Sequence, residues 1–201
     1  MAKPPLPKRT QASRSQASRT RIIQEATRLF GQAGYRGTRL ADIARAVNMT
    51  EPGVLHHFGS KENLLISVLQ ERDRIDEENY AHTVGREEFE ILAALRSLVE
   101  HNETVPGLVQ LFTLLVAESI PSGHPSHDYF ISRYQSSRVV LAEEIRKAQQ
   151  KGSLRNDLQP EMLAAMLFAM MDGLQIQWLL QPQELGMTKI FDRFLELLQP
   201  Q

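Results

Sequence analysis

The sequence predicts an all-α protein of about nine helices, and three observations support this fold class. Apolar residues recur at intervals of three and four along most of the chain, which is the period of an amphipathic helix. No stretch shows the alternation of a half-buried strand, and no pair of such stretches flanks a hairpin turn. Aromatic residues make up only 6% of the 201 residues, so the core must consist mostly of aliphatic side chains.

The first helix is expected over residues 18–31, where Ile22, Ala26 and Phe30 share one face. Residues 1–17 before it are basic and Pro-rich, and they contain no acidic residue. Such a composition buries too little apolar surface to order itself, so we expect a disordered basic arm. Two alternatives stay open for this arm, namely a contact with phosphate or the minor groove and a solvated tail.

Three helix starts follow within residues 38–65. Thr38 is expected to cap a short helix over residues 39–46, and Thr50 a second one that contains Pro52 in its first turn. Gly59 ends the second helix, and Ser60 starts a long third one. Two short helices joined by a tight turn form a helix-turn-helix, and three neighbouring N-termini present free N–H groups that suit phosphate.

The remaining expected helices are separated by Pro and Gly signals. The helix from Ser60 is expected to reach about residue 80, which gives it enough length to connect two parts of the molecule. The further helices are expected at residues 89–99, 106–120, 129–150, 160–180 and 185–198.

The net charge of -1 conceals a strong asymmetry along the chain. Residues 1–61 contain 11 Lys and Arg against 3 Asp and Glu, whereas residues 62–201 contain 12 against 21. A basic N-terminal part favours DNA and an acidic remainder avoids it. The absence of cysteine excludes disulfides and thiolate metal sites, and no secretory signal or spanning segment is evident. We therefore expect a soluble, cytoplasmic protein that does not bind membranes.

Residues 20–66 resemble the N-terminal DNA-binding domain of the TetR (tetracycline-repressor) family. The resemblance is carried by the pattern AxxLFxxxGYxxT from Ala26 to Thr38, by DIA from Asp42 to Ala44, and by LHHF before GSKENLL. A DGLxxQWLL run from Asp172 to Leu180 resembles one near the end of many members. The resemblance implies a DNA-binding domain over residues 18–66 and a helical effector-binding and dimerisation domain over residues 67–201.

The resemblance also implies which residues meet DNA. The second helix of the motif would lie in the major groove and reach base edges from its first turns. The sequence departs from the family at Glu51, Pro52 and Leu55, where a small or basic residue, a glycine and a tyrosine are common. Leu55 is then either an apolar contact with a thymine methyl group or part of the core. The expected base contacts are Thr50, Glu51, Gly53 and His56, and the expected phosphate contacts are Thr38, Arg39, His57 and Lys61.

Neither metal binding nor catalysis is expected. His56 and His57 are adjacent on a helix and point about 100° apart, so they cannot share one ion. His124 and His127 are interpreted as surface histidines in a loop. No catalytic motif or phosphate-binding loop is present, and we expect no enzyme activity, no cofactor and no metal.

Two features of the C-terminal part remain. Methionine and aromatic side chains can line an adaptable ligand cavity, although at helical spacing they are more often ordinary core. Gly173 permits close approach of another helix, and the apolar stripe within residues 190–198 suggests an interface. The expected effector pocket comprises Phe112, Tyr134, Met166, Met170 and Trp178, and the expected dimer interface comprises Gly173, Phe191, Phe194 and Leu198.

The sequence therefore predicts a homodimeric repressor that binds a palindromic operator in double-stranded DNA and is released by a small apolar or amphipathic effector. One alternative is a ligand-independent DNA-binding regulator whose body only dimerises. Another is a helical small-molecule binding protein in which the N-terminal cluster is structural.

Overall fold

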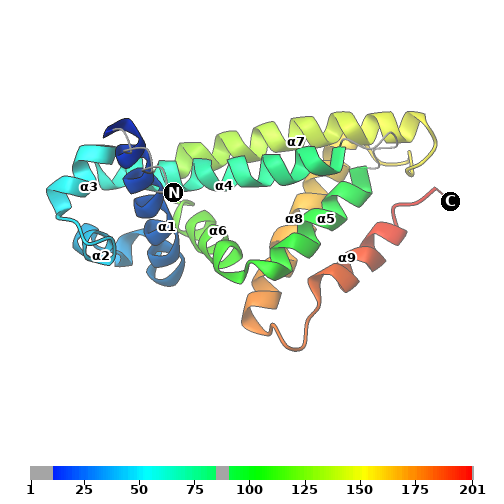
Figure 1. Cartoon of the computed structure of the whole chain (residues 1–201). Coiled ribbons are helices and arrows are strands. Elements are labelled where there is room, and N and C mark those ends of the chain that lie inside the picture. The colour runs from blue at the N-terminus through cyan, green and yellow to red at the C-terminus, as the bar shows by residue number, and fades with distance from the viewer. Residues whose placement is uncertain (1–10, 85–90, 201) are drawn as a thin grey trace, which may run out of the picture.

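The computed structural model describes residues 11–84 and 91–200, which form nine α-helices and no β-strand (Figure 1). The all-α fold class and the expected order of helices are confirmed. The expected position Phe89 lies outside the described residues. The helices are α1 (Gln11–Gly37), α2 (Leu40–Ala46), α3 (Glu51–Phe58), α4 (Lys61–Val84), α5 (Ile91–Thr104), α6 (Pro106–Glu118), α7 (His127–Gln150), α8 (Pro160–Leu180) and α9 (Met187–Glu196).

Helix α1 begins at Gln11, well before the expected start at residue 18. Residues 11–17, which the sequence assigned to a disordered basic arm, are therefore helical, and that part of the prediction is wrong. Their side chains are exposed, so no apolar face marks them in the sequence. They extend the helix through backbone bonds, and the Thr20 hydroxyl adds a bond to the Gln16 carbonyl at 3.1 Å. The rest of the expected arm lies outside the described residues.

The path of the chain into the helix-turn-helix is set by Gly34, which has φ 69° and breaks α1. Glycine accepts this left-handed conformation without the steric cost of a Cβ atom. The buried Thr38 hydroxyl then lies 2.8 Å from the Gly34 carbonyl and 3.1 Å from the Leu29 carbonyl, to which it donates. Thr38 is thus not the N-cap of α2 as expected; that position belongs to Arg39.

The helix-turn-helix itself is confirmed. The turn after α2 places Asn48 at φ 53°, a left-handed conformation that asparagine tolerates better than most residues. Thr50 caps α3 as expected, because its hydroxyl oxygen accepts a bond from the Gly53 N–H at 3.2 Å. Val54 and Phe58 fix α3 to the core of the N-terminal cluster.

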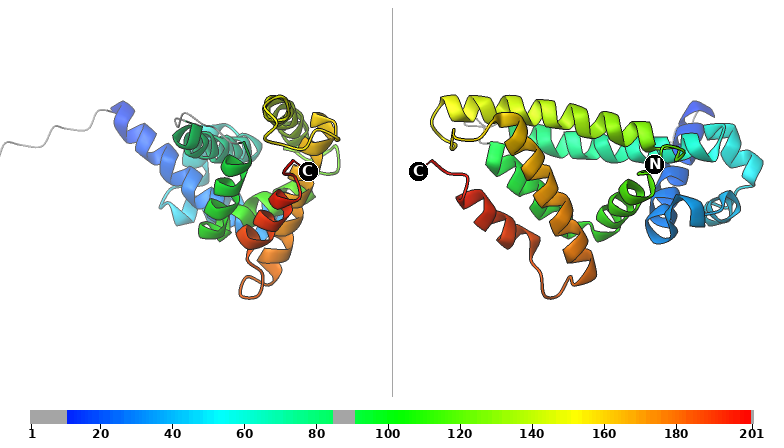
Figure 2. Two further views of the ribbon diagram at one scale, coloured as in Figure 1. Left: turned by 90° about the vertical axis from the view of Figure 1, so that its right-hand side faces the viewer. Right: turned by 180° about the vertical axis from the view of Figure 1, so that it is seen from behind.

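The two longest helices of the body, α4 and α7, both run along the length of the molecule (Figures 1 and 2) and are joined by side-chain hydrogen bonds. The Tyr129 hydroxyl on α7 lies 3.3 Å from the Leu69 carbonyl of α4, and Arg133 Nε lies 2.8 Å from an Asp73 oxygen. Helices α1 to α3 occupy one end of the molecule, while α5, α8 and α9 form the other (Figure 1). Because α4 starts in the motif and continues along the body, it connects these two ends.

The apolar core divides into two clusters, and the first is shared between the N-terminal helices and the body. Leu111, Phe112 and Leu115 of α6 belong to the same cluster as the inner faces of α1 to α4. A Cβ atom on Gly31 would lie only 3.2 Å from the Gly107 carbonyl oxygen, so α1 and α6 approach closely. The N-terminal helices therefore complete their core with α6, and the boundary at residue 66 stays a prediction.

Two of the four residues expected at the dimer interface, Phe191 and Leu198, are buried in the second core cluster, which corrects the prediction for these two. Phe191 is fully buried and Leu198 is 3% exposed, and Phe194 packs against the same cluster. The stripe on α9 meets α5, whose Leu95 and Val99 lie in this cluster. The expectation failed because the sequence does not reveal that α5 supplies an internal partner for α9.

Helix α8 is apolar on two faces. Its inner face joins the second core cluster through residues such as Leu163, Leu167 and Leu174. Its outer face leaves large apolar side chains accessible, with Ile176 49% exposed and Leu180 77% exposed. Among the described residues, α8 is the one helix long and apolar enough to cross a membrane, and its packed inner face accounts for that composition equally well.

Candidate nucleic-acid interface and effector pocket

Helix α3 presents an accessible face at the end of the molecule (Figure 1). Val54 and Phe58 point into the core, while Glu51 and His56 are exposed. Leu55 is 36% exposed, so it is not part of the core, and its contact with a thymine methyl group stays a prediction. An eight-residue helix held from one side only leaves its other side open for a groove. This face is formed by Thr50, Glu51, Gly53, Leu55, His56 and His57.

The beginning of α3 combines a cap with an accessible hydroxyl. Thr50 is exposed, and its oxygen accepts from the Gly53 N–H, which leaves the hydroxyl proton available to an outside acceptor. A Cβ atom on Gly53 would lie 3.3 Å from both the Thr50 oxygen and Met49 Cε. Glycine thus keeps the first turn of α3 uncrowded.

The expected phosphate contacts differ in how they are held. Arg39 is exposed at the N-terminus of α2. Lys61 is half-buried, and its Nζ donates to the Tyr35 carbonyl at 2.6 Å and lies 4.2 Å from the centre of the Tyr35 ring. Burial lowers the pKa of Lys61 despite the neighbouring Glu62. Thr38 is buried with its hydroxyl bonded internally, so its side chain does not face a phosphate.

Arg19 has a structural function that the sequence analysis missed. Its guanidinium donates to the His57 carbonyl at 2.8 Å and to the Ser67 hydroxyl at 3.1 Å, and it lies 4.2 Å from the centre of the Phe58 ring. Arg19 therefore joins the end of α3 to α1 and α4. In the sequence, Arg19 cannot be distinguished from an arginine that faces DNA.

The histidines do not form a metal site among the residues that the structure describes. The rings of His56 and His57 meet edge to face with centres 5.7 Å apart, and neither has a carboxylate partner in that part of the chain. His124 is 4% exposed, so its interpretation as a surface histidine is wrong. It is buried because Ser119 and Ser126 bond to its Nδ1 at 3.1 and 3.0 Å and close the loop between α6 and α7.

The five side chains expected to form one effector pocket are not brought together. Trp178 lies in the second core cluster, Met170 packs against it, and Met166 is 42% exposed on the outer face of α8. Phe112 lies in the first core cluster, and Tyr134 packs against that cluster. The methionines of α8 failed as a pocket signal because helical spacing alone does not distinguish a core face from an outer face.

Charged groups of α4, α7 and α8 meet around Phe112 and Tyr134. The guanidinium of Arg72 lies 3.9 Å from the centre of the Phe112 ring, and that of Arg133 lies 5.0 Å away. The Tyr134 hydroxyl donates to Asp172 at 2.7 Å. Burial raises the pKa of Asp172 and also that of Tyr134. This polar network lies inside the body and fixes α7 relative to α8.

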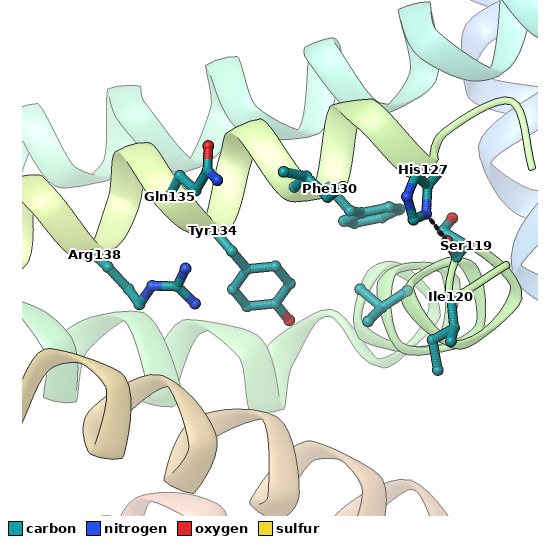
Figure 3. A pocket seen from close by; sticks show the side chains of 9 residues that line it. Ser119, Ile120, His127, Phe130, Tyr134, Gln135 and Arg138 are labelled. Atoms are coloured by element: carbon teal, nitrogen blue, oxygen red, sulfur yellow. Dashed lines mark hydrogen bonds between the residues drawn. The ribbon is translucent and has the colours of Figure 1, made fainter. Parts of the chain in front are cut away.

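A cavity of about 300 Å³ lies between α6 and α7 beside this network (Figure 3), and it is open to solvent along Ile131, Gln135 and Arg138, which are exposed. Tyr134 is the one residue of the expected pocket that lines it. His127 at one end is bonded through Nδ1 to the Ser119 carbonyl at 2.8 Å. Arg138 lies at the other end of the same face of α7 (Figure 3). The complete lining consists of Val116, Ser119, Ile120, His127, Phe130, Ile131, Tyr134, Gln135 and Arg138.

The segment that lines this cavity also touches the N-terminal helices. Glu118, at the end of α6, accepts a bond from the Tyr35 N–H at 2.7 Å. The Tyr35 ring meets the buried His124 edge to face with centres 5.2 Å apart, and its hydroxyl donates to Glu62 at 2.8 Å. The junction between the body and the helix-turn-helix is therefore a chain of contacts from Ser119 to the start of α4, made of hydrogen bonds and the ring contact between Tyr35 and His124.

Comparisons with known proteins agree with this geometry. Residues 22–68 match the model of the tetR family of bacterial regulatory proteins, and residues 91–200 match that of the C-terminal part of BetI-type transcriptional repressors. The HTH-type transcriptional repressor AcnR of Corynebacterium efficiens is 25% identical over 179 residues, covering 87% of this chain and 89% of AcnR.

Two solved structures share the fold over nearly the whole chain. A putative transcriptional regulator from Saccharomonospora viridis in complex with choline has a TM-score of 0.77 and 25% identity, covering 90% of this chain and 96% of that one. AibR in complex with isovaleryl coenzyme A and operator DNA has a TM-score of 0.72 and 25% identity, covering 91% and 98%. Since these relatives are regulators and not enzymes, and since the two family models together match most of the sequence, this chain belongs to the TetR family of DNA-binding transcriptional regulators.

Proposed function

We propose that this protein is a homodimeric repressor that inserts α3 into the major groove of a pseudo-palindromic operator. The observation that carries the proposal is the accessible face of α3, capped by Thr50 and anchored from behind by Arg19. AibR, a regulator of similar structure, is known in complex with operator DNA. A single short helix binds weakly, so useful affinity requires two copies that meet grooves about 34–36 Å apart or a multiple of that spacing.

The outer face of α8 is the surface we assign to the dimer. Its exposed residues follow helical spacing and form one apolar stripe, and a Cβ atom on Gly173 would meet nothing within 4 Å. Contiguous apolar surface of this kind usually marks an interface. This assignment keeps Gly173 from the sequence prediction and replaces the α9 residues. The stripe consists of Met162, Met166, Ala169, Gly173, Ile176 and Leu180.

The dimer assignment is tested by placing charge on the stripe. The double variant Met166→Glu and Ile176→Glu should sediment as a monomer and lose operator binding while its helical circular dichroism is unchanged, because carboxylates would have to enter a desolvated contact. Leu197→Glu, which changes a residue that is 67% exposed and directly follows α9, is the matched control and should remain dimeric. A stable dimer of the double variant would move the interface elsewhere.

We further propose that an effector bound in the body weakens operator binding. The cavity between α6 and α7 supports this, because its lining residue Ser119 belongs to the same bonded segment as Glu118 and His124. Relatives with ligands in their structures include the choline complex and the isovaleryl coenzyme A complex. A gel shift with an operator selected from random duplex DNA, repeated with small-molecule panels, separates this proposal from ligand-independent binding.

A further inference from the structure

The lining of the cavity between α6 and α7 is apolar in the middle and carries a single full charge. From this chemistry we infer that the effector is a small amphipathic carboxylate, whose carboxylate binds Arg138 and whose apolar body packs on Phe130 and Tyr134. The inference rests on the proposed function, since it names the ligand class for the effector site. It goes beyond the two solved structures described above, which hold choline and isovaleryl coenzyme A.

The charge of the cavity favours an anion. Arg138 is the only Lys or Arg among its lining residues, and the lining contains no Asp or Glu. Within the described part of the chain no carboxylate forms an ion pair with Arg138, whereas Arg133 and Arg146 on the same helix are paired with Asp73 and Glu161. A guanidinium binds a carboxylate through two parallel hydrogen bonds. A quaternary ammonium ion would find no opposite charge in this lining.

The middle of the cavity favours a flat or branched apolar body. Val116 and Phe130 come from α6 and α7, and the Tyr134 ring extends beside Arg138 from the same side of α7 (Figure 3). The Tyr134 hydroxyl donates its proton to Asp172 at 2.7 Å, so the ring of Tyr134 is available to a ligand and the hydroxyl proton is not. A volume of about 300 Å³ is at the small end of ligand pockets and suits a substituted benzoate or cinnamate rather than a whole coenzyme.

The far end of the cavity favours a hydrogen-bond donor on the ligand. His127 Nδ1 lies 2.8 Å from the Ser119 carbonyl, which can only accept, so Nδ1 carries the proton. The Nε2 atom of the neutral ring is then an acceptor. A ligand with a hydroxyl or amine opposite its carboxylate would satisfy both ends, and it would touch the segment that leads through Ser119 to the N-terminal helices.

The test is calorimetric titration of the full chain with 4-hydroxycinnamate, with its methyl ester and with choline, together with a panel of benzoates and phenylacetates and their methyl esters. The acids should bind at least about tenfold more tightly than their esters, because a charge-assisted bond is lost on esterification. Choline should give no binding heat. The acid that binds most tightly should also release operator DNA in a gel shift.

Variants of α7 locate the carboxylate. Arg138→Gln should weaken binding of the acid by about tenfold or more and leave ester binding unchanged, and Arg138→Lys should recover part of the loss. Arg146→Gln is the matched control, because Arg146 is exposed on the same helix and is not part of the lining. Sedimentation and thermal melting of each variant show whether the dimer and the fold are preserved.

Three results with the acids, the esters and the Arg138 variant would overturn the inference. These are equal binding of acids and esters, unchanged acid binding by Arg138→Gln, and an Arg138→Gln variant that alters only the dimer equilibrium, which would assign the arginine to an intersubunit contact. If choline or an ester instead releases the operator, the inference fails while the proposed function stands. Failure of the wild-type chain to select any operator would count against the proposed function alone, since ligand binding is measured without DNA.

Discussion

At the scale of single residues, the basic side chains at the N-terminal end divide into those that face outward and those that join helices. Arg39 is exposed, whereas Arg19 joins α1 to α3 through the His57 carbonyl and Lys61 is bonded to the Tyr35 carbonyl. The sequence identified this region as basic, but it could not separate the two groups. In the sequence, a side chain of either type is simply one positive charge, and only the structure shows whether a carbonyl accepts its hydrogen bonds.

Arg39 and Lys61 should therefore respond differently to removal. Arg39→Ala should lower the slope of log affinity against log salt concentration by about 1, on specific and random DNA alike, with unchanged thermal stability. Lys61→Ala should lower this slope and also the free energy of unfolding, by about 0.5–1.5 kcal/mol, since the bond to the Tyr35 carbonyl is lost. Salt titrations and denaturant unfolding measure both. An unchanged slope for Lys61→Ala would make it an internal anchor only.

Thr50 combines a cap with an expected base contact, and two substitutions separate these. Thr50→Ala should cost about 1 kcal/mol of stability because the Gly53 N–H loses its acceptor, while Thr50→Ser keeps the cap. If Thr50 and His56 touch bases, Thr50→Ala and His56→Ala should each cost about 1–3 kcal/mol on the operator and change the preferred base at symmetric positions. Selection from random duplexes checks this, and identical preferences for all variants would contradict it.

At the scale of elements, capping residues and apolar periodicity predicted the helix boundaries that depend on the local sequence. The boundaries of α6, α7 and α8 follow proline, glycine and apolar spacing, and Thr50 caps α3 as expected. The errors fall where the partner is distant in sequence. Residues 11–17 have no apolar face, yet they continue α1, and the apolar stripe of α9 is covered by α5. A periodic pattern indicates that one face of a helix is buried, but it does not indicate which other element covers that face.

The burial of α9 gives a direct stability prediction. Phe191→Ala should lower the free energy of unfolding by about 3–5 kcal/mol, because Phe191 is fully buried and its removal leaves a cavity against α5. Leu197→Ala, at a neighbouring exposed position, should change it by no more than about 0.5 kcal/mol. Urea unfolding of both variants measures the difference. A Phe191→Ala protein that merely dissociates to stable monomers would restore the interface first expected from the sequence.

At the scale of the whole molecule, the body and the helix-turn-helix are one packed unit around α1 and α6. The close approach at Gly31 and Gly107 and the bond from Tyr35 to Glu118 lie on this contact. The sequence resemblance over residues 20–66 agrees with the family match over residues 22–68. It did not indicate this junction, because the sequence does not distinguish Glu118 from any other acid at the end of a helix. The cavity between α6 and α7 could not be predicted either, because its lining comes from these two helices and the loop between them.

Glu118 should therefore control how firmly the two ends are joined. In Glu118→Ala the Tyr35 N–H loses its acceptor, which costs about 1–3 kcal/mol when the donor stays buried, and its amide hydrogen should exchange faster. Glu118→Gln keeps a side-chain oxygen and should retain most of the protection. Gly34→Ala tests the same contact from the other side, because φ 69° disfavours a Cβ atom and this atom would collide with the Glu118 carboxylate.

Hydrogen exchange and calorimetry measure how firmly Glu118 joins the body to the helix-turn-helix. With the junction intact, body and helix-turn-helix should unfold in one transition, and Glu118→Ala should broaden or divide it. The same variant should show a smaller change in operator affinity when an effector binds, because coupling between two sites requires a connection that differs between the two states. Full protection of the Tyr35 amide in Glu118→Ala, with a single unchanged transition, would mean that the α1–α6 apolar contact alone joins the two ends.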